Sequence, residues 1–141
     1  MGIMYSAGAA STAATNASDA TSLKAVNNSF ALREYVFSGL ATASAANEWV
    51  LQRNTTGAIT TTLNPVGGLT STSITVYANA IATATTALSQ LHRFGCNGNG
   101  ALFRWVAAPG LAVEARTAGQ IGWRALSGTS LTAMSCIIEE F

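Results

Sequence analysis

Charged side chains are scarce in this chain. Only 9% of its 141 residues are Asp, Glu, Lys or Arg, against about 25% in an average soluble domain. The formal net charge is +1, so the chain has neither the basic surface that binds nucleic acid nor an acidic tail. Charged residues are depleted at the centres of protein interfaces because their desolvation is costly. The low charge therefore predicts a surface largely covered by partner proteins, although Thr- and Ser-rich β domains are often poor in charge for no such reason.

Residues suited to catalysis and metal binding are equally few. The sequence has one histidine, His92, and one aspartate, Asp19, and no serine lies in the context of a nucleophile elbow. A zinc site requires three or four ligands, and besides His92 the only soft candidates are Cys96 and Cys136. The two thiols are expected to be free and buried, with a disulfide as the alternative. We therefore expect no metal, no cofactor and no enzymatic activity.

Three glutamates leave a hydrolase as the weakest of the functional alternatives. Glu34, Glu48 and Glu114 each lie within a strand-like run, and a pair of carboxylates is what a glycosidase requires. Carboxylates on strands are more often solvated or engaged in ion pairs. A small β-fold hydrolase is for this reason only a third hypothesis.

Long apolar runs of the kind that span a membrane are absent from the sequence. The N-terminal stretch is rich in Ala, Ser and Thr and lacks the basic residue and apolar segment of a signal peptide. We therefore expect no membrane contact and synthesis in the cytoplasm of the producing cell.

The first 28 residues differ in composition from the rest. They are mainly small, apart from Ile3, Met4 and Tyr5, and they follow no sustained period. Because small residues bury little apolar area, residues 1–28 are predicted to form an extended N-terminal arm that is loose in the monomer. Such an arm could order on a neighbouring subunit by adding a strand to its sheet. The remainder, residues 29–141, is predicted to be a single domain.

Strand-like runs arrive every 8–12 residues in this second region, with Gly, Asn or Pro turns between them, which is the spacing of a β-sandwich or jelly roll. The three glycines of residues 95–100 indicate a hairpin tip, because a strand and not a helix follows. Residues 79–92 are ambiguous between a short helix and an irregular crossover. The predicted fold is an all-β, jelly-roll-like antiparallel sandwich of about eight strands, with runs at 29–37, 47–53, 57–63, 70–77, 101–107, 111–117, 120–126 and 130–139.

Trp49, Trp105 and Trp123 allow two interpretations. Tryptophans on an open sheet face can stack on sugars, which would make the chain a carbohydrate-binding module. Tryptophans also fill sandwich cores and subunit interfaces, and this second interpretation is favoured. Arg104 precedes Trp105 and Arg124 follows Trp123, so in a strand each pair points to opposite faces, one residue inward and one outward.

Candidate interface residues are the apolar tip of the arm, charged and aromatic residues within strands, and the C-terminal aromatic residue. In-strand charges of opposite sign could fix the register between subunits. The candidates are Ile3, Met4, Tyr5, Arg33, Tyr35, Glu114, Arg116 and Phe141.

The small-residue arm, the charge-poor β domain, the Gly/Asn loops and the lack of a catalytic set together resemble a bacteriophage capsid decoration (cement) protein or a related minor virion protein. The resemblance covers the whole chain at the level of architecture, and no residue role is carried over from it. It implies a jelly-roll-like subunit, often a homotrimer, on the outer capsid surface. There it would bind the major capsid protein and hold the shell against internal DNA pressure, without itself contacting nucleic acid. A carbohydrate-binding or host-attachment module of a tail or fibre is the alternative.

Overall fold

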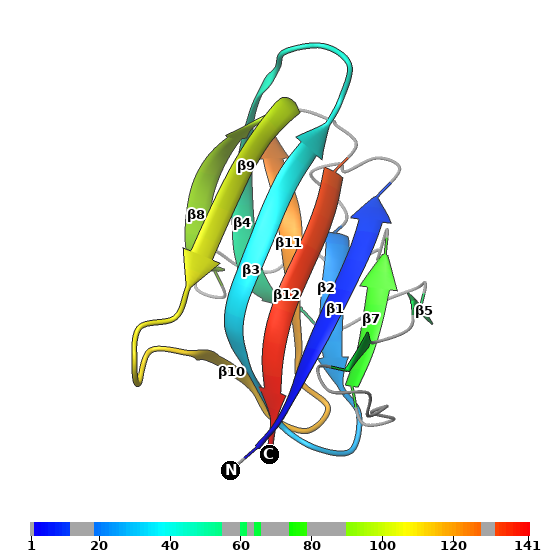
Figure 1. Ribbon diagram of the computed structural model, residues 1–141, viewed down its shortest axis with the longest axis vertical. Coiled ribbons are helices and arrows are strands. Elements are labelled where there is room, and N and C mark those ends of the chain that lie inside the picture. The colour runs from blue at the N-terminus through cyan, green and yellow to red at the C-terminus, as the bar shows by residue number, and fades with distance from the viewer. Residues whose placement is uncertain are drawn as a thin grey trace.

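Two antiparallel β-sheets pack face to face in the computed structural model, which confirms the predicted all-β sandwich (Figure 1). The structure describes residues 2–11, 19–54, 60–61, 64–65, 74–78, 90–127 and 132–141. In these ranges all the regular elements are strands, and no helix there could cross a membrane. The strands are β1 (Ile3–Ser11), β2 (Asp19–Ala25), β3 (Phe30–Leu40), β4 (Ala46–Asn54), β5 (Thr60–Thr61), β6 (Asn64–Pro65), β7 (Ile74–Ala78), β8 (Gln90–Asn97), β9 (Asn99–Val106), β10 (Val113–Ala115), β11 (Gln120–Ser127) and β12 (Thr132–Glu140).

The strand pairing is that of a jelly roll. In sheet A the order is β10-β3-β12-β1-β6, and β9 pairs with β3 beyond the end of β10. In sheet B the order is β5-β7-β2-β11-β4-β8. The strands β1 to β4 alternate between the sheets, and they pair in reverse order with β12, β11, β9 and β8. A long hairpin rolled up in this way gives the jelly-roll sandwich.

The N-terminal region differs from the sequence-based expectation. Instead of a loose arm, Ile3–Ser11 forms β1, which pairs along its whole length with β12 of the same chain and is flanked on its other side by β6. Asp19–Ala25 forms β2, an inner strand between β11 and β7. The prediction of an extended arm over residues 1–28 is wrong for these two segments, and residues 12–18 lie outside the described residues. Small side chains bury little area, but their backbone ladders tie both strands into the sandwich.

The other predicted strands agree with the observed strands to different extents. The runs around 29–37, 47–53, 101–107, 120–126 and 130–139 form β3, β4, β9, β11 and β12, while the run at 111–117 shortens to β10. The runs at 57–63 and 70–77 are described only where β5 and β7 lie. Of the ambiguous residues 79–92, the last three begin β8, and 79–89 lie outside the described part of the chain.

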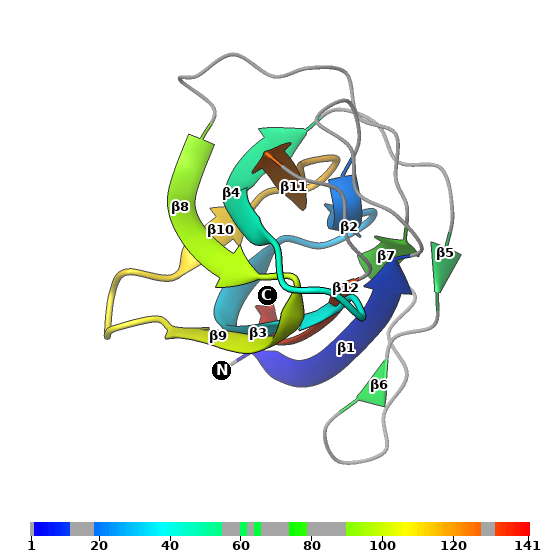
Figure 2. The ribbon, with the colours of Figure 1, turned by 90° about the horizontal axis from the view of Figure 1, so that it is seen from above.

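Large aromatic side chains fill the space between the sheets. Figure 2 shows from above how the two sheets face each other. Trp49 and Trp123 from sheet B and Tyr35 and Phe37 from sheet A are at most 1% exposed. Each buried side chain of this size stabilises the fold by roughly 1.5–3 kcal/mol. Where β8 and β9 end the two sheets on one side, the rings of Phe94 and Phe103 stack with centroids 4.2 Å apart and close the gap.

Candidate interaction face of sheet A

A β-bulge in β3 shapes the outer face of sheet A. Opposite β12, Glu34 pairs with Ile137 and Leu32 with Ile138, so Arg33 is the extra residue. The bulge interrupts the inward–outward alternation: Leu32 and Tyr35 are fully buried, whereas Arg33 and Glu34 between them are both half-exposed. It also marks the place where the neighbour of β3 changes from β10 to β9. The bulge therefore places two adjacent charged residues, Arg33 and Glu34, on the same side of the sheet.

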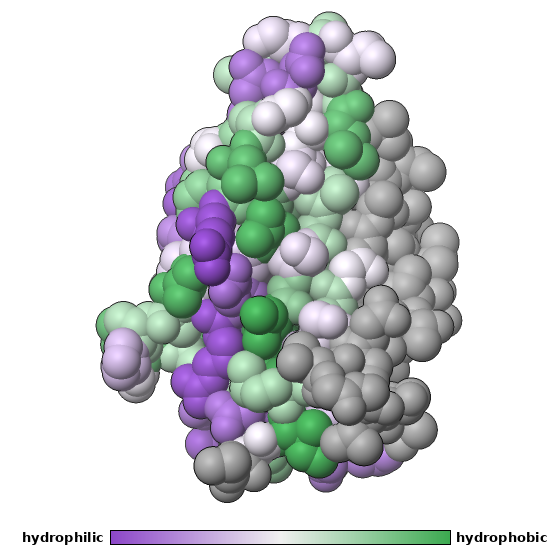
Figure 3. Space-filling model, in the orientation of Figure 1, coloured by the Kyte–Doolittle hydropathy of each residue, from purple (hydrophilic) through white to green (hydrophobic). Residues whose placement is uncertain are grey.

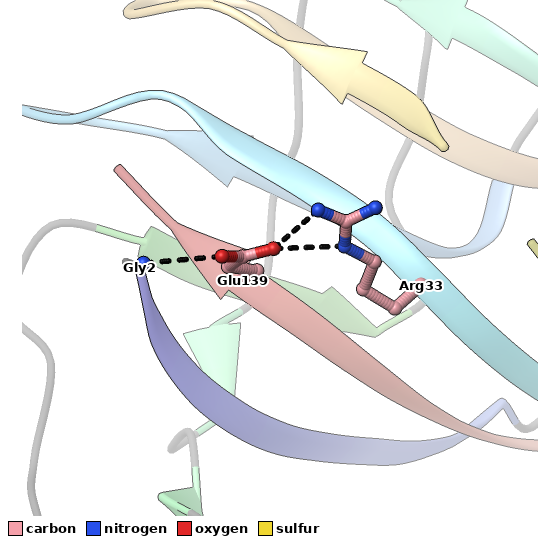
Figure 4. Close-up of polar contacts among 3 residues, drawn as sticks. All are labelled: Gly2, Arg33 and Glu139. Carbon is pink, nitrogen blue, oxygen red and sulfur yellow. Dashed lines mark hydrogen bonds and ion pairs between the residues drawn. The ribbon is translucent and has the colours of Figure 1, made fainter. Parts of the chain in front are cut away.

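Each of these charges has a partner on a neighbouring strand. The guanidinium of Arg33 on β3 donates hydrogen bonds to Oε2 of Glu139 on β12, and the distance from Nε to this oxygen is 2.9 Å. The other carboxylate oxygen, Oε1, accepts the backbone N–H of Gly2 at 3.1 Å (Figure 4). These contacts hold the pKa of Glu139 below its ordinary value, chiefly through the hydrogen bond from Arg33 and then through Gly2. One carboxylate thus joins β12 to β3 and to the start of β1.

Glu34 forms the second ion pair of this face. Its Oε1 accepts from Nε of Arg104 on β9 at 2.8 Å, and this contact raises the pKa of the arginine. The four charges carried by the two pairs sum to zero, two positive and two negative. Arg33, a candidate interface residue, and its neighbour Glu34 thus both already bind residues of their own chain.

An apolar groove lies among these charges. It is a shallow depression of about 510 Å³, lined by Gly2, Met4, Arg33, Glu34, Val106, Ala107, Ile137 and Glu139. Its apolar walls come from three strands and from the residue after β9. Farther along β9, Leu102 is 70% exposed and Val106 is 55% exposed, with Arg104 between them. Figure 3 looks onto this face and shows apolar patches beside a band of hydrophilic residues.

The structure divides the candidate interface residues into three groups. Tyr5 and Tyr35 lie in the core, 3% and 0% exposed, and have no surface for a partner. Met4 and Arg33 line the groove. The remaining four are exposed elsewhere: Ile3 and Phe141 where the N- and C-terminal strands meet, and Glu114 and Arg116 in and after β10.

The tryptophans bear on the carbohydrate hypothesis. Trp49 and Trp123 are buried, which leaves a half-buried Trp105 as the tryptophan with accessible surface. Trp105 is turned toward the interior, where its ring lies 5.5 Å from that of Tyr35, and its neighbour Arg104 is exposed. The predicted inward and outward orientation of the Arg-Trp pair is confirmed, and no open row of aromatic rings is formed by these three residues.

Chemically reactive side chains are dispersed. Within the described residues no three His, Cys, Asp or Glu side chains come close enough to hold a metal ion. His92 accepts or donates a 2.8 Å hydrogen bond at Nδ1 with the hydroxyl of Tyr35, and burial lowers the pKa of this histidine. Glu48 forms an ion pair with Arg93 at 2.7 Å.

The two cysteines are free, as expected. Cys136 lies on the inner side of β12, and burial raises the pKa of its thiol to about 12. Cys96 on β8 is also buried, and the pKa of its thiol is raised for the same reason. A buried thiol with a raised pKa is a poor nucleophile.

Sequence reasoning missed the residues that give the outer face its apolar character, namely Leu102, Val106 and Ile137, and it also missed the exposed loop residue Leu111. A signal for two of them was present, because Leu102, Arg104 and Val106 alternate with inward-facing aromatic residues. The bulge at Arg33 had no such signal, since it depends on the register between β3 and β12.

Comparisons with known proteins give no family for the chain: no protein-family model matches it, and no curated protein matches it either.

Proposed function

We propose that this chain is a non-enzymatic structural subunit of a virus particle, which binds a capsid lattice as a decoration protein through the outer face of sheet A. The observation that carries the proposal is the composition of that face. Leu102 and Val106 are more than half exposed beside an apolar groove, while the charges around the groove are already paired within the chain.

An exposed apolar surface of this kind suits a protein interface. Burial of apolar area provides about 25 cal/mol per Å², and paired charges need not lose their partners when the surface is covered. Unpaired charges would oppose burial because their desolvation is not compensated. The face is therefore better suited to contact with protein than to binding a charged substrate.

The fold is compatible with this role without requiring it. Jelly rolls occur in viral capsid domains and in lectins, so the fold alone supports both a capsid role and a sugar-binding role. The burial of Trp49 and Trp123 weakens the second, because stacking on a sugar requires an exposed ring. We retain the capsid role as the proposal, with a homotrimer as the expected form of the subunit.

Sedimentation with capsid shells tests the proposal. The genes that flank the coding sequence identify the particle, and shells assembled without this protein are mixed with the purified chain. We expect saturable co-sedimentation that Leu102→Asp weakens at least tenfold. Leu91→Asp is the matched control, because Leu91 is 39% exposed on β8 of sheet B and therefore lies outside the proposed binding face.

Two results would contradict the proposed function. One is the absence of co-sedimentation with shells. The other is glycan binding that shifts the fluorescence of the chain and is lost in Trp105→Ala, which would support the attachment module instead.

A further inference from the structure

We infer that the loop between β9 and β10 of one copy of the chain, residues 107–112, inserts into the groove on the outer face of sheet A of a second copy. The inference rests on the proposed role as an assembling subunit and assigns the contact through which copies associate. It commits to a head-to-tail arrangement, in which each copy gives one loop and receives another.

The loop has the form of a preformed apolar projection. It extends from the side of the sandwich beyond β9 (Figure 1). Leu111 donates its backbone N–H to the carbonyl of Ala108 at 2.9 Å. The central residues of this turn are Pro109 and Gly110, the latter with a φ of 78°, which is the pair that a type II turn favours. Leu111 at its end is 70% exposed. A rigid turn loses little conformational entropy on binding.

The charges of the groove favour this loop over a charged partner. Residues 107–112 read AAPGLA and contain no charge. When such a segment enters the groove, Arg33 can remain with Glu139 and Arg104 with Glu34. A charged segment would either disrupt these pairs or bury a charge that has no partner, and both are costly.

The charged residues that follow the loop are electrostatically compatible with the charged residues around the groove. Glu114 and Arg116 follow the loop, and both are exposed. Neither forms an ion pair with another of the described residues. A loop seated in the groove brings one charge of each sign toward a surface that carries two of each sign. Charges at an interface rim fix orientation more than they add affinity, so these two residues favour a single docking orientation.

The tip of the loop and the groove are different surfaces of one molecule, joined at Ala107, which begins the loop and lines the groove. The groove lies on the flat outer side of sheet A, whereas the tip of the loop projects beyond its edge (Figures 1 and 2). A contact between two different surfaces is heterologous, and such contacts generate closed rings or open filaments. A ring occupies every loop and every groove, and three is the number of copies expected from the proposed function.

Three variants and one control test the contact by measurement of mass in solution. Leu111→Ser removes the apolar tip of the loop, and Val106→Lys places a charge in the groove. We expect the unmodified chain to form a closed oligomer and both variants to be monomeric. Leu91→Ser changes an exposed leucine on β8 of sheet B and should have the mass of the unmodified chain. Circular dichroism and the emission of the buried tryptophans verify that each variant is folded.

Mixing the two defective variants identifies the contact. Leu111→Ser keeps an intact groove and Val106→Lys keeps an intact loop, so an equimolar mixture can form one productive contact. We expect a dimer with one copy of each variant, and no larger species. A third variant that carries both substitutions should remain monomeric with either partner.

The inference is overturned if the unmodified chain is monomeric at its highest soluble concentration, if Leu111→Ser keeps the oligomeric mass, or if the mixture stays monomeric. These outcomes are separable from failure of the proposed function. Shell binding that persists when Leu111→Ser remains oligomeric contradicts only the loop contact. A ring that forms as expected but does not bind shells contradicts only the capsid role.

Discussion

The hydroxyl of Tyr35 lies 2.8 Å from Nδ1 of His92, and this hydrogen bond connects β3 of sheet A with β8 of sheet B. Burial raises the pKa of the tyrosine and lowers that of the histidine. The pair is therefore uncharged at neutral pH, and the tautomer of the imidazole decides which of the two groups donates the hydrogen bond.

This pair predicts that the fold is less stable in mild acid. The pKa of His92 in the folded chain lies below its ordinary value of 6.5, so the unfolded chain takes up the proton first as pH falls. The stabilisation is present above pH 6.5 and is lost as pH falls through the pKa of the folded state. Urea unfolding at a series of pH values should show this loss, and His92→Phe should be less sensitive over that range. Equal sensitivity in both proteins would exclude the histidine as the cause.

Removal of the Tyr35 hydroxyl should reduce the free energy of unfolding only modestly. Tyr35→Phe keeps the ring among its aromatic neighbours and removes one hydrogen bond, so the free energy of unfolding should fall by about 1 kcal/mol. Chemical denaturation at pH 7.5 measures the difference. A change above about 3 kcal/mol would indicate that the hydroxyl supports more than its bond to His92.

Adjacent residues of β1 should differ sharply in their contribution to stability. Tyr5 is 3% exposed in the core, whereas Met4 is 36% exposed on the outer face. Tyr5→Ala should reduce the free energy of unfolding by about 3–5 kcal/mol, as large-to-small aromatic substitutions in cores do. Met4→Ala, the matched control, should change it by about 0.5 kcal/mol or less. Equal small effects would mean that β1 is not part of the folded sandwich.

Gly2 is predicted to tolerate no side chain. A Cβ at this position would lie 2.4 Å from the carbonyl oxygen of Glu140 and 2.5 Å from Cγ of Glu139. Gly2→Ala should therefore disrupt the bond to the Glu139 carboxylate and lower the melting temperature. Gly100→Ala is an informative comparison, because nothing lies within 4 Å of a Cβ there and its cost comes from a φ of 68° alone.

Local loosening at Gly2 has its own signature in hydrogen exchange. In Gly2→Ala, the amides of the first residues of β1 should exchange faster, while those of sheet B should be unchanged. Faster exchange throughout both sheets would point to global destabilisation instead.

The thiols of Cys96 and Cys136 should be unreactive toward thiol reagents in the native state. Since the pKa of Cys136 is about 12 and its side chain is buried, almost no thiolate is present at pH 8. A chromogenic disulfide reagent should react with neither cysteine on mixing, and with both after unfolding in guanidinium. Rapid reaction of the native chain would show that the sandwich opens at β8 or β12.

The fold class was predictable because it depends on local patterns. Alternation such as that of Leu102 to Val106 and the turns at Pro109 and Gly110 specify strands and their ends without reference to the rest of the chain. The pairing of β1 with β12 was not predictable from such patterns. It depends on hydrogen bonds between Ile3–Ser11 and a strand more than a hundred residues away, and backbone pairing of this kind leaves no trace in composition.

The same distinction applies to the candidate face. Arg33 and Glu34 were recognisable as strand charges, but their bulge and their partners Glu139 and Arg104 follow from tertiary register. Tyr35 was expected at an interface because aromatic residues are enriched there, yet it is fully buried. Sequence identifies which residues are unusual, and packing decides which side of the sheet they occupy.

The pairing of β1 with β12 also has a consequence for biosynthesis. β12 lies between β1 and β3 in sheet A, and β11 lies between β2 and β4 in sheet B. β1 and β2 are therefore translated long before β12 and β11, the strands with which they pair. Neither sheet can form completely until β11 and β12 have been translated. Contacts so distant in sequence slow folding and leave strand edges exposed in the meantime. Ala, Ser and Gly make up most of β1, which limits the apolar surface that this strand exposes until β12 has been translated.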